Sequence, residues 1–140
     1  MRVLDERELE RLKRRLVIAD TSVLLLIAEG IDVIGQIEEM GGLCAVTPSV
    51  LRELERISEE QSKRGRAARL VLPIVLEQCP ILNANLERRT DDDIVSIALR
   101  YGLAVATADK GLRRRLLRKV PTIYYREAQR RLYSEDFFAY

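Results

Sequence analysis

The chain has 140 residues, of which 47% are hydrophobic, so we expect one domain (residues 1–140) with a substantial apolar core. Its 24 basic and 22 acidic residues leave a net charge of only +2, and it contains no histidine. The missing histidine excludes imidazole acid–base catalysis, Ser-His-Asp triads and histidine-ligated zinc. No apolar run approaches the length of a membrane span, so we expect no membrane association.

The first 15 residues are rich in charge and predict an N-terminal helix, with a narrow apolar stripe that includes Leu4, Leu9 and Leu12. A chain that is charged from its first residues does not resemble a secretory signal. We therefore expect a cytoplasmic protein.

Beyond this helix, short apolar segments alternate with helical ones. Strands are predicted at residues 16–20, 43–47, 79–82, 103–107 and 122–125. Helices are predicted at residues 23–27, 31–40, 48–58, 67–77, 90–101 and 111–118, and the C-terminal tail (127–140) is expected to be partly helical. This alternation predicts the α/β class, with a parallel sheet covered on both faces.

The two cysteines, Cys44 and Cys79, both fall in predicted strands. Two cysteines without histidine cannot form a structural zinc site. We favour buried, small hydrophobic side chains over a disulfide.

Four acidic residues lie where a predicted strand is followed by a helix or loop. Asp20 closes the first strand, Glu53 lies one to two turns into the helix after the second, Asp91 opens a helix, and Asp109 follows the fourth strand. Ligands of open α/β sheets bind outside the carboxyl ends of the strands, so these acids should converge on one crevice. Gathered carboxylates repel one another unless a hard cation neutralises them, and oxygen ligands suit Mg²⁺ or Mn²⁺.

Each acid also has a structural interpretation. Asp20 and Asp109 are both suitable as helix N-caps. Glu53 falls within the apolar stripe formed by Val50 and Leu54, and an acid there is costly unless it binds a metal or is paired in a buried ion pair. The combination of four acids at four such junctions favours the metal site.

Three consecutive acids lie in the first turn of the helix predicted at residues 90–101, and helical geometry gives each of them a different environment. Asp91 lies above Ile94 and Ala98 on the sheet-facing stripe, so we assign it to the metal. Asp92 points to the side of this sheet-facing stripe, and we assign it a supporting role beside the metal ligands. Asp93 is expected to turn toward Arg100 and solvent.

Four segments around these acids resemble the PIN-domain family of metal-dependent nucleases, and the similarity covers roughly residues 16–126. The segments are Val17-Ile18-Ala19-Asp20-Thr21-Ser22, Thr47-Pro48-Ser49-Val50-Leu51-Arg52-Glu53-Leu54, Asp91-Asp92-Asp93-Ile94-Val95-Ser96-Ile97-Ala98 and Val105-Ala106-Thr107-Ala108-Asp109-Lys110-Gly111-Leu112. The resemblance implies a three-layer α/β/α sandwich whose central parallel sheet has about five strands in the order 3-2-1-4-5. It also implies a hydrolase, a Mg²⁺- or Mn²⁺-dependent endoribonuclease that cleaves single-stranded RNA.

The resemblance assigns the metal and the catalysis to Asp20, Glu53, Asp91 and Asp109. Ser22 matches a family position that helps to orient the first aspartate, and Thr107 and Asp92 are supporting candidates beside the ligands. Phosphates of the RNA are expected to be guided by basic residues after the fourth strand and before the 90–101 helix, namely Lys110, Arg113, Arg114, and Arg88 or Arg89. The alternative interpretation of each of these basic residues is an ordinary position on a solvent-exposed helix face.

Two biological roles fit this chemistry. The basic segment at residues 109–115 favours an RNA-processing nuclease, for which a ribosome-assembly partner is expected. The alternative is a VapC-type toxin held inactive by an antitoxin. From another class, the chain could be a catalytically idle PIN-like scaffold that binds RNA or protein, although the intact acid set disfavours this. We expect a homodimer in either case.

Overall fold

The computed structural model describes residues 2–83 and 89–135. Its strands are β1 (Val3–Leu4), β2 (Leu16–Ala19), β3 (Leu43–Ala45), β4 (Ile81–Leu82), β5 (Ala104–Thr107), β6 (Thr122–Arg126) and β7 (Arg131–Ser134). Its helices are α1 (Glu6–Leu12), α2 (Thr21–Leu24), the 3₁₀ helix η1 (Leu25–Glu29), α3 (Val33–Glu39), α4 (Pro48–Ser58), α5 (Lys63–Gln78), α6 (Thr90–Tyr101) and α7 (Lys110–Leu116).

The main sheet has the order β3-β2-β5-β6-β7 and is parallel except for β7, which runs antiparallel to β6. The chain passes from β2 to β3 on one side and later places β5 on the other side of β2. Every residue of β2 and β5 is buried, as expected for parallel strands covered on both faces. The strand order therefore reverses direction at the β2–β5 pair, where ligand crevices of such sheets form.

The predicted third strand corresponds to β4, which pairs with β1 in a separate two-stranded sheet. It still lies beside β3, because a single parallel bridge joins Val46 to Ile81. With β4 placed there, the five predicted strands follow the predicted order 3-2-1-4-5.

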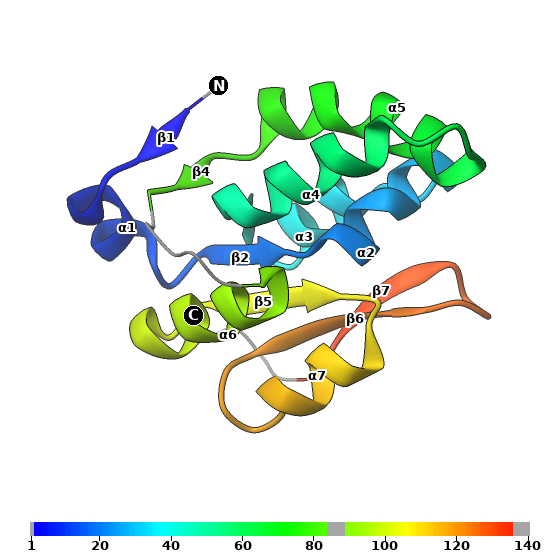
Figure 1. The fold of residues 1–140 in the computed structure, drawn as a ribbon. Helices are drawn as coiled ribbons and strands as arrows, with labels where there is room; N and C mark the ends of the chain where they lie inside the picture. Colours follow the sequence, from blue (N-terminus) through cyan, green and yellow to red (C-terminus); the bar gives the residue numbers. More distant parts are fainter. Residues whose placement is uncertain (1, 84–88, 136–140) are drawn as a thin grey trace.

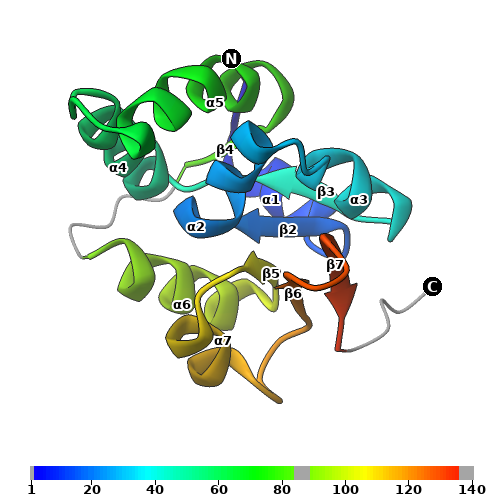
Figure 2. The ribbon, with the colours of Figure 1, turned by 90° about the vertical axis from the view of Figure 1, so that its right-hand side faces the viewer.

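The helices form two groups (Figures 1 and 2). Helices α4 and α5 pack together on one side of the molecule, and α6 and α7 lie on the opposite side, with β2 and β5 between the groups. The α/β/α sandwich expected from the sequence is therefore confirmed. Figure 1 also shows that α1 lies at the amino end of β2, away from the carboxyl ends of β2 and β5.

Both ends of the chain differ from the sequence prediction. The N-terminal helix is shorter than predicted, because Val3–Leu4 pair with β4 and Asp5 begins α1 with a capping box. The C-terminal tail contains β7 where partial helix was expected. The backbone of Leu132 donates to the buried side chain of Gln36 (2.8 Å), a contact with a distant segment that local sequence cannot indicate.

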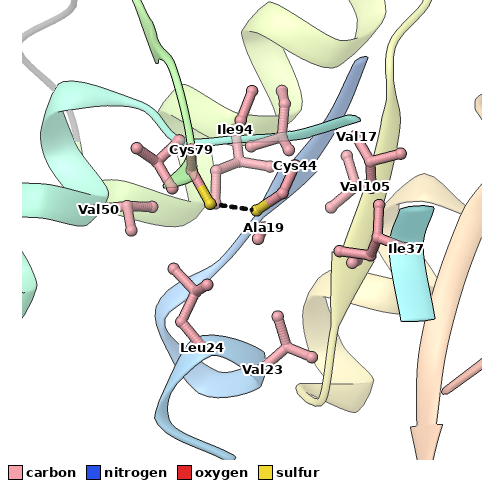
Figure 3. Packing of buried hydrophobic residues seen from close by; sticks show 14 of the residues in the cluster. Val17, Ala19, Val23, Leu24, Ile37, Cys44, Val50, Cys79, Ile94 and Val105 are labelled. Atoms are coloured by element: carbon pink, nitrogen blue, oxygen red, sulfur yellow. Dashed lines mark hydrogen bonds between the residues drawn. The ribbon is translucent and has the colours of Figure 1, made fainter. Parts of the chain in front are cut away.

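The core is continuous across the sheet and includes both cysteines (Figure 3). Cys44 and Cys79 are buried, free thiols, and the Cys79 Sγ donates to the Cys44 Sγ at 2.7 Å. The hydrogen bond from Cys79 and burial raise the pKa of the Cys44 thiol well above its usual range. Among the described residues, no helix has the length and apolar character that crossing a membrane requires.

Candidate active site

Asp20 follows β2 and is almost fully buried, with 3% of its surface exposed. It caps α2, because its Oδ1 accepts from the Val23 backbone (3.0 Å) and from the Ser22 hydroxyl (2.7 Å). Its Oδ2 accepts from Thr107 Oγ1 at 2.5 Å. Burial raises the pKa of Asp20 to about 6 even though these hydrogen bonds lower it. The cap and ligand interpretations are therefore compatible in one residue.

The two hydroxyl residues beside Asp20 also hold the loop after β5. Thr107 Oγ1 accepts from the Asp109 backbone (2.9 Å), and Ser22 Oγ accepts from the Ala108 backbone (3.0 Å). Both side chains thus connect Asp20 to the segment that carries Asp109. The two supporting candidates named from the sequence, Ser22 and Thr107, therefore both contact Asp20 directly.

Glu53 lies on α4, which begins with Thr47 as N-cap and Pro48 in its first turn. Val50 and Leu54 on the same helix are fully buried, whereas Glu53 is half-buried at the edge of this apolar stripe. No hydrogen bond or ion pair to its side chain is present within the described part of the chain. The buried ion pair considered from the sequence is therefore not formed there.

Asp91 lies in the first turn of α6 and is half-buried. Its pKa is raised by burial and then by the nearby negative charges of Asp109 and Glu53. Asp92 instead forms an ion pair with Arg115 (2.9 Å), so its carboxylate is already compensated. Among the three consecutive acids, Asp91 is the one that lines a pocket together with Asp20, Glu53 and Asp109.

Asp93 corrects one expectation. It is buried rather than directed to solvent, with 2% of its surface exposed, and its Oδ1 has no hydrogen-bond partner in the described structure. The helix begins where it was predicted, but Asp93 lies one turn before Ile97 and shares its buried face of α6.

Asp109 is the N-cap of α7, and its Oδ1 accepts from the backbones of Gly111 (2.7 Å) and Leu112 (3.2 Å). The remaining carboxylate oxygen makes no hydrogen bond within residues 2–83 and 89–135. As with Asp20, capping uses one oxygen and leaves charge available for the crevice.

The four predicted acids line one pocket of about 280 Å³. Its walls are completed by Thr21, Ser22, Leu25 and Arg64. Thr21 was not identified from the sequence, and its buried hydroxyl oxygen has no partner in the described structure. The side chain of Arg64 is half-exposed, and its guanidinium lies 3.8 Å from the carboxylate of Glu60. It therefore offsets the negative charge of the pocket only weakly.

A second pocket of about 630 Å³ shares Glu53, Asp91 and Asp109 with the first. Its remaining walls carry four arginines and three polar residues: Arg52, Arg56, Arg89, Arg115, Ser49, Thr90 and Asp92. Sequence reasoning identified only Arg89 and Asp92 among these, because the arginines come from segments far apart in the chain. Arg88 lies outside the described residues.

The three predicted RNA-binding residues after β5 do not line either pocket. Lys110 and Arg114 are exposed on α7. Arg113 is engaged elsewhere, since its Nε donates to Glu135 (2.6 Å) and its guanidinium stacks 3.6 Å above the Tyr124 ring.

The donor chemistry of the smaller pocket fits a hard divalent cation. Its four acids offer only oxygen ligands, and the pKa of Asp91 is raised first by burial and then by its acidic neighbours, which together outweigh the opposite effect of Arg115. As the side chains stand, no three acids or cysteines within the described ranges meet the spacing of a metal site. An ion would therefore require side-chain movements that bring the acids closer together, and Asp109 is exposed.

Comparisons with known proteins agree with the α/β/α fold. The model of the family described as "PIN like domain" matches residues 17–128, so the chain belongs to the PIN-like domain family. Ribonuclease VapC9 of Archaeoglobus fulgidus is 35% identical over 124 residues, covering 84% of this chain and 88% of that protein. The solved structure of the PIN domain endonuclease Utp24 has a TM-score of 0.69 at 22% identity, with 86% of this chain and 90% of that chain covered. At this identity the Utp24 likeness shows the fold alone.

Proposed function

We propose that this protein is a divalent-metal-dependent endoribonuclease that hydrolyses phosphodiester bonds of single-stranded RNA. The observation that carries the proposal is the convergence of Asp20, Glu53, Asp91 and Asp109 on one pocket at the β2–β5 switch point. Membership of the PIN-like family and the identity to a protein named a ribonuclease support a nuclease.

These four acids would hold Mg²⁺ or Mn²⁺, and the bound ion would supply Lewis-acid activation of water and of the phosphate. Hydrolysis adds the water oxygen to phosphorus and breaks the bond to the 3′ oxygen, leaving 5′-phosphate and 3′-hydroxyl ends. Thr107 and Ser22 fix the carboxylate of Asp20 by donating to its two oxygens. The chain has no histidine, so no imidazole takes part in the proton transfers.

The decisive experiment compares two aspartates that both cap helices. Asp20→Asn should abolish Mn²⁺-stimulated cleavage of a single-stranded RNA, because it removes ligand charge while preserving shape. Asp32 caps α3 in the same way, through Gly35 (3.0 Å), and is not among the residues lining either pocket. Asp32→Asn should cleave like the wild-type protein. Full activity in purified Asp20→Asn would overturn the assignment of catalysis to this pocket, whereas a wild-type protein that does not cleave RNA would favour an idle scaffold.

For the biological role we keep RNA processing as the first proposal, in the cytoplasm and as a homodimer. A VapC-type toxin controlled by an antitoxin is the second candidate, favoured by the 35% identity to Ribonuclease VapC9. Expression in a bacterial host separates them: a toxin should arrest growth, and Asp20→Asn should relieve the arrest. Normal growth with the active protein would favour processing, and sedimentation of the purified protein tests the dimer.

A further inference from the structure

The larger pocket opens directly beside the proposed cleavage site. It shares three acids with the smaller pocket, so a strand whose phosphate lies among the acids must continue along one of the neighbouring surfaces. The volume of about 630 Å³ is within the usual range for a specific ligand site.

Two arginines of α4 form one wall of this larger pocket. Arg52 and Arg56 are four residues apart, so they project from neighbouring turns of the same helix face. Both are exposed, and neither makes an ion pair or side-chain hydrogen bond in the part of the chain that the structure describes. Arg115, from α7, is paired with Asp92.

A polyanionic strand approaching four carboxylates is repelled unless fixed positive charge lies close to its path. Guanidinium groups supply such charge at every physiological pH, and their planar fork matches two oxygens of a phosphate. Arg52 directly precedes Glu53 in the sequence, Arg56 follows it by three residues, and both arginines line a pocket that Glu53 shares. Their position therefore suits a phosphate next to the one that is cleaved.

We propose that Arg52 and Arg56 form a phosphate subsite that binds the RNA backbone on one side only of the scissile phosphate. This inference rests on the proposed nuclease function and adds the surface along which the bound RNA strand continues beyond the four acids. It also assigns the contacts with RNA phosphates to α4, whereas the sequence predicted them for residues of α7.

Binding tests the subsite separately from cleavage. In the Asp20→Asn background, with EDTA present, the affinity for a fluorescent single-stranded RNA would be measured by anisotropy at several salt concentrations. Adding Arg52→Ala and Arg56→Ala should weaken binding at least tenfold and reduce the salt slope by about 1.4, as expected for two lost phosphate contacts. The matched control is Arg7→Ala with Arg11→Ala, two exposed arginines with the same spacing on α1, at the other end of β2.

The control pair should change the affinity by less than twofold. Equal losses of affinity in both pairs would show that only the total charge of the protein matters, and this would overturn the subsite. Unchanged affinity in the α4 pair would overturn it as well. If the wild-type protein cleaves RNA but the α4 pair leaves KM unaltered, the subsite fails while the proposed function stands. If the wild-type protein does not cleave RNA but only the α4 pair loses affinity, the cleavage proposal fails and the backbone-binding site remains.

One-sidedness has its own measurement. Oligonucleotides with a single neutral methylphosphonate, placed at successive positions around the cleavage site, should bind more weakly only when the neutral group lies on one side. That loss should disappear in the α4 pair, because the arginines that sense the charge are gone. Equal losses on both sides, persisting in the α4 pair, would contradict the assignment.

Discussion

Asp20 shows how a buried carboxylate can be both structural and chemically available. Three donors hold its oxygens, yet burial outweighs them and favours the neutral form. The negative charge of Asp91 acts in the same direction. Folding therefore places a carboxyl group where its ionised form is costly until a cation compensates it.

This predicts that the metal-free protein becomes less stable as pH rises from about 4 to about 6. The pKa of Asp20 is raised from 3.8 to about 6 in the folded state, so the folded chain binds the extra proton within this window. The stabilisation is complete below the unfolded-state pKa and is lost through the folded-state pKa, a total of about 3 kcal/mol. Urea unfolding in EDTA at pH 4–7 measures it. Asp20→Asn should flatten the profile, and parallel profiles would contradict this account.

Neighbouring acids in the first turn of α6 should behave differently. Asp91→Asn should slow RNA cleavage about 100-fold or more, since a loss of about 3 kcal/mol in the transition state has that effect. Asp92→Asn should change the rate by less than about threefold and the stability by less than about 1 kcal/mol, because its half-exposed pair with Arg115 is worth little. Single-turnover kinetics on the two purified variants measures both effects. A larger loss in Asp92→Asn would reverse the assignment.

At the scale of the elements, α7 is fixed to the β6–β7 hairpin by Arg113. Its guanidinium donates to Glu135 and stacks on Tyr124 of β6. The Glu135 backbone in turn donates to Thr122 at 3.0 Å. These contacts hold the helix that Asp109 begins, so Arg113 acts on the site through the fold.

We predict that Arg113→Ala destabilises the protein by about 1–2 kcal/mol, from the lost ion pair and cation–π contact. Arg114→Ala on the exposed side of the same helix should cost less than about 0.5 kcal/mol. Chemical denaturation of the two variants provides the comparison. RNA affinity measured well below the unfolding transition should be nearly the same in both. A selective loss of affinity in Arg113→Ala would restore it as an RNA-binding residue.

At the scale of the whole molecule, periodic patterns determined what could be predicted. The buried strands β2 and β5 are continuous apolar runs, and Glu53 was conspicuous because it interrupts the apolar stripe of α4. Strand β7 buries only Leu132 and depends on the distant Gln36, so no apolar run in the local sequence indicates it. Similarly, the arginines of the larger pocket belong to α4, α7 and the residue before α6, and only the fold brings them together.

The four acids are separated by up to 89 residues in sequence, as the numbers of Asp20 and Asp109 show, and they meet only in the folded chain. A cation that binds this pocket therefore stabilises the folded state alone. At a Mn²⁺ concentration about 100 times its dissociation constant, the gain should be about 2.7 kcal/mol. Such a gain raises the midpoint of thermal unfolding by on the order of 10 °C, and EDTA should reverse it.

Glu53 and Glu55 provide a matched pair for this final prediction, because both are on α4 and only Glu53 lines the smaller pocket. Glu55→Gln should keep the full Mn²⁺-dependent shift, since its side chain is exposed. Glu53→Gln should lose most of the shift, and it should raise the stability of the metal-free protein by relieving repulsion with Asp91. Differential scanning calorimetry with and without Mn²⁺ measures both effects. Equal shifts in the two variants would place the ion elsewhere, and no shift in the wild-type protein would exclude a tight divalent site.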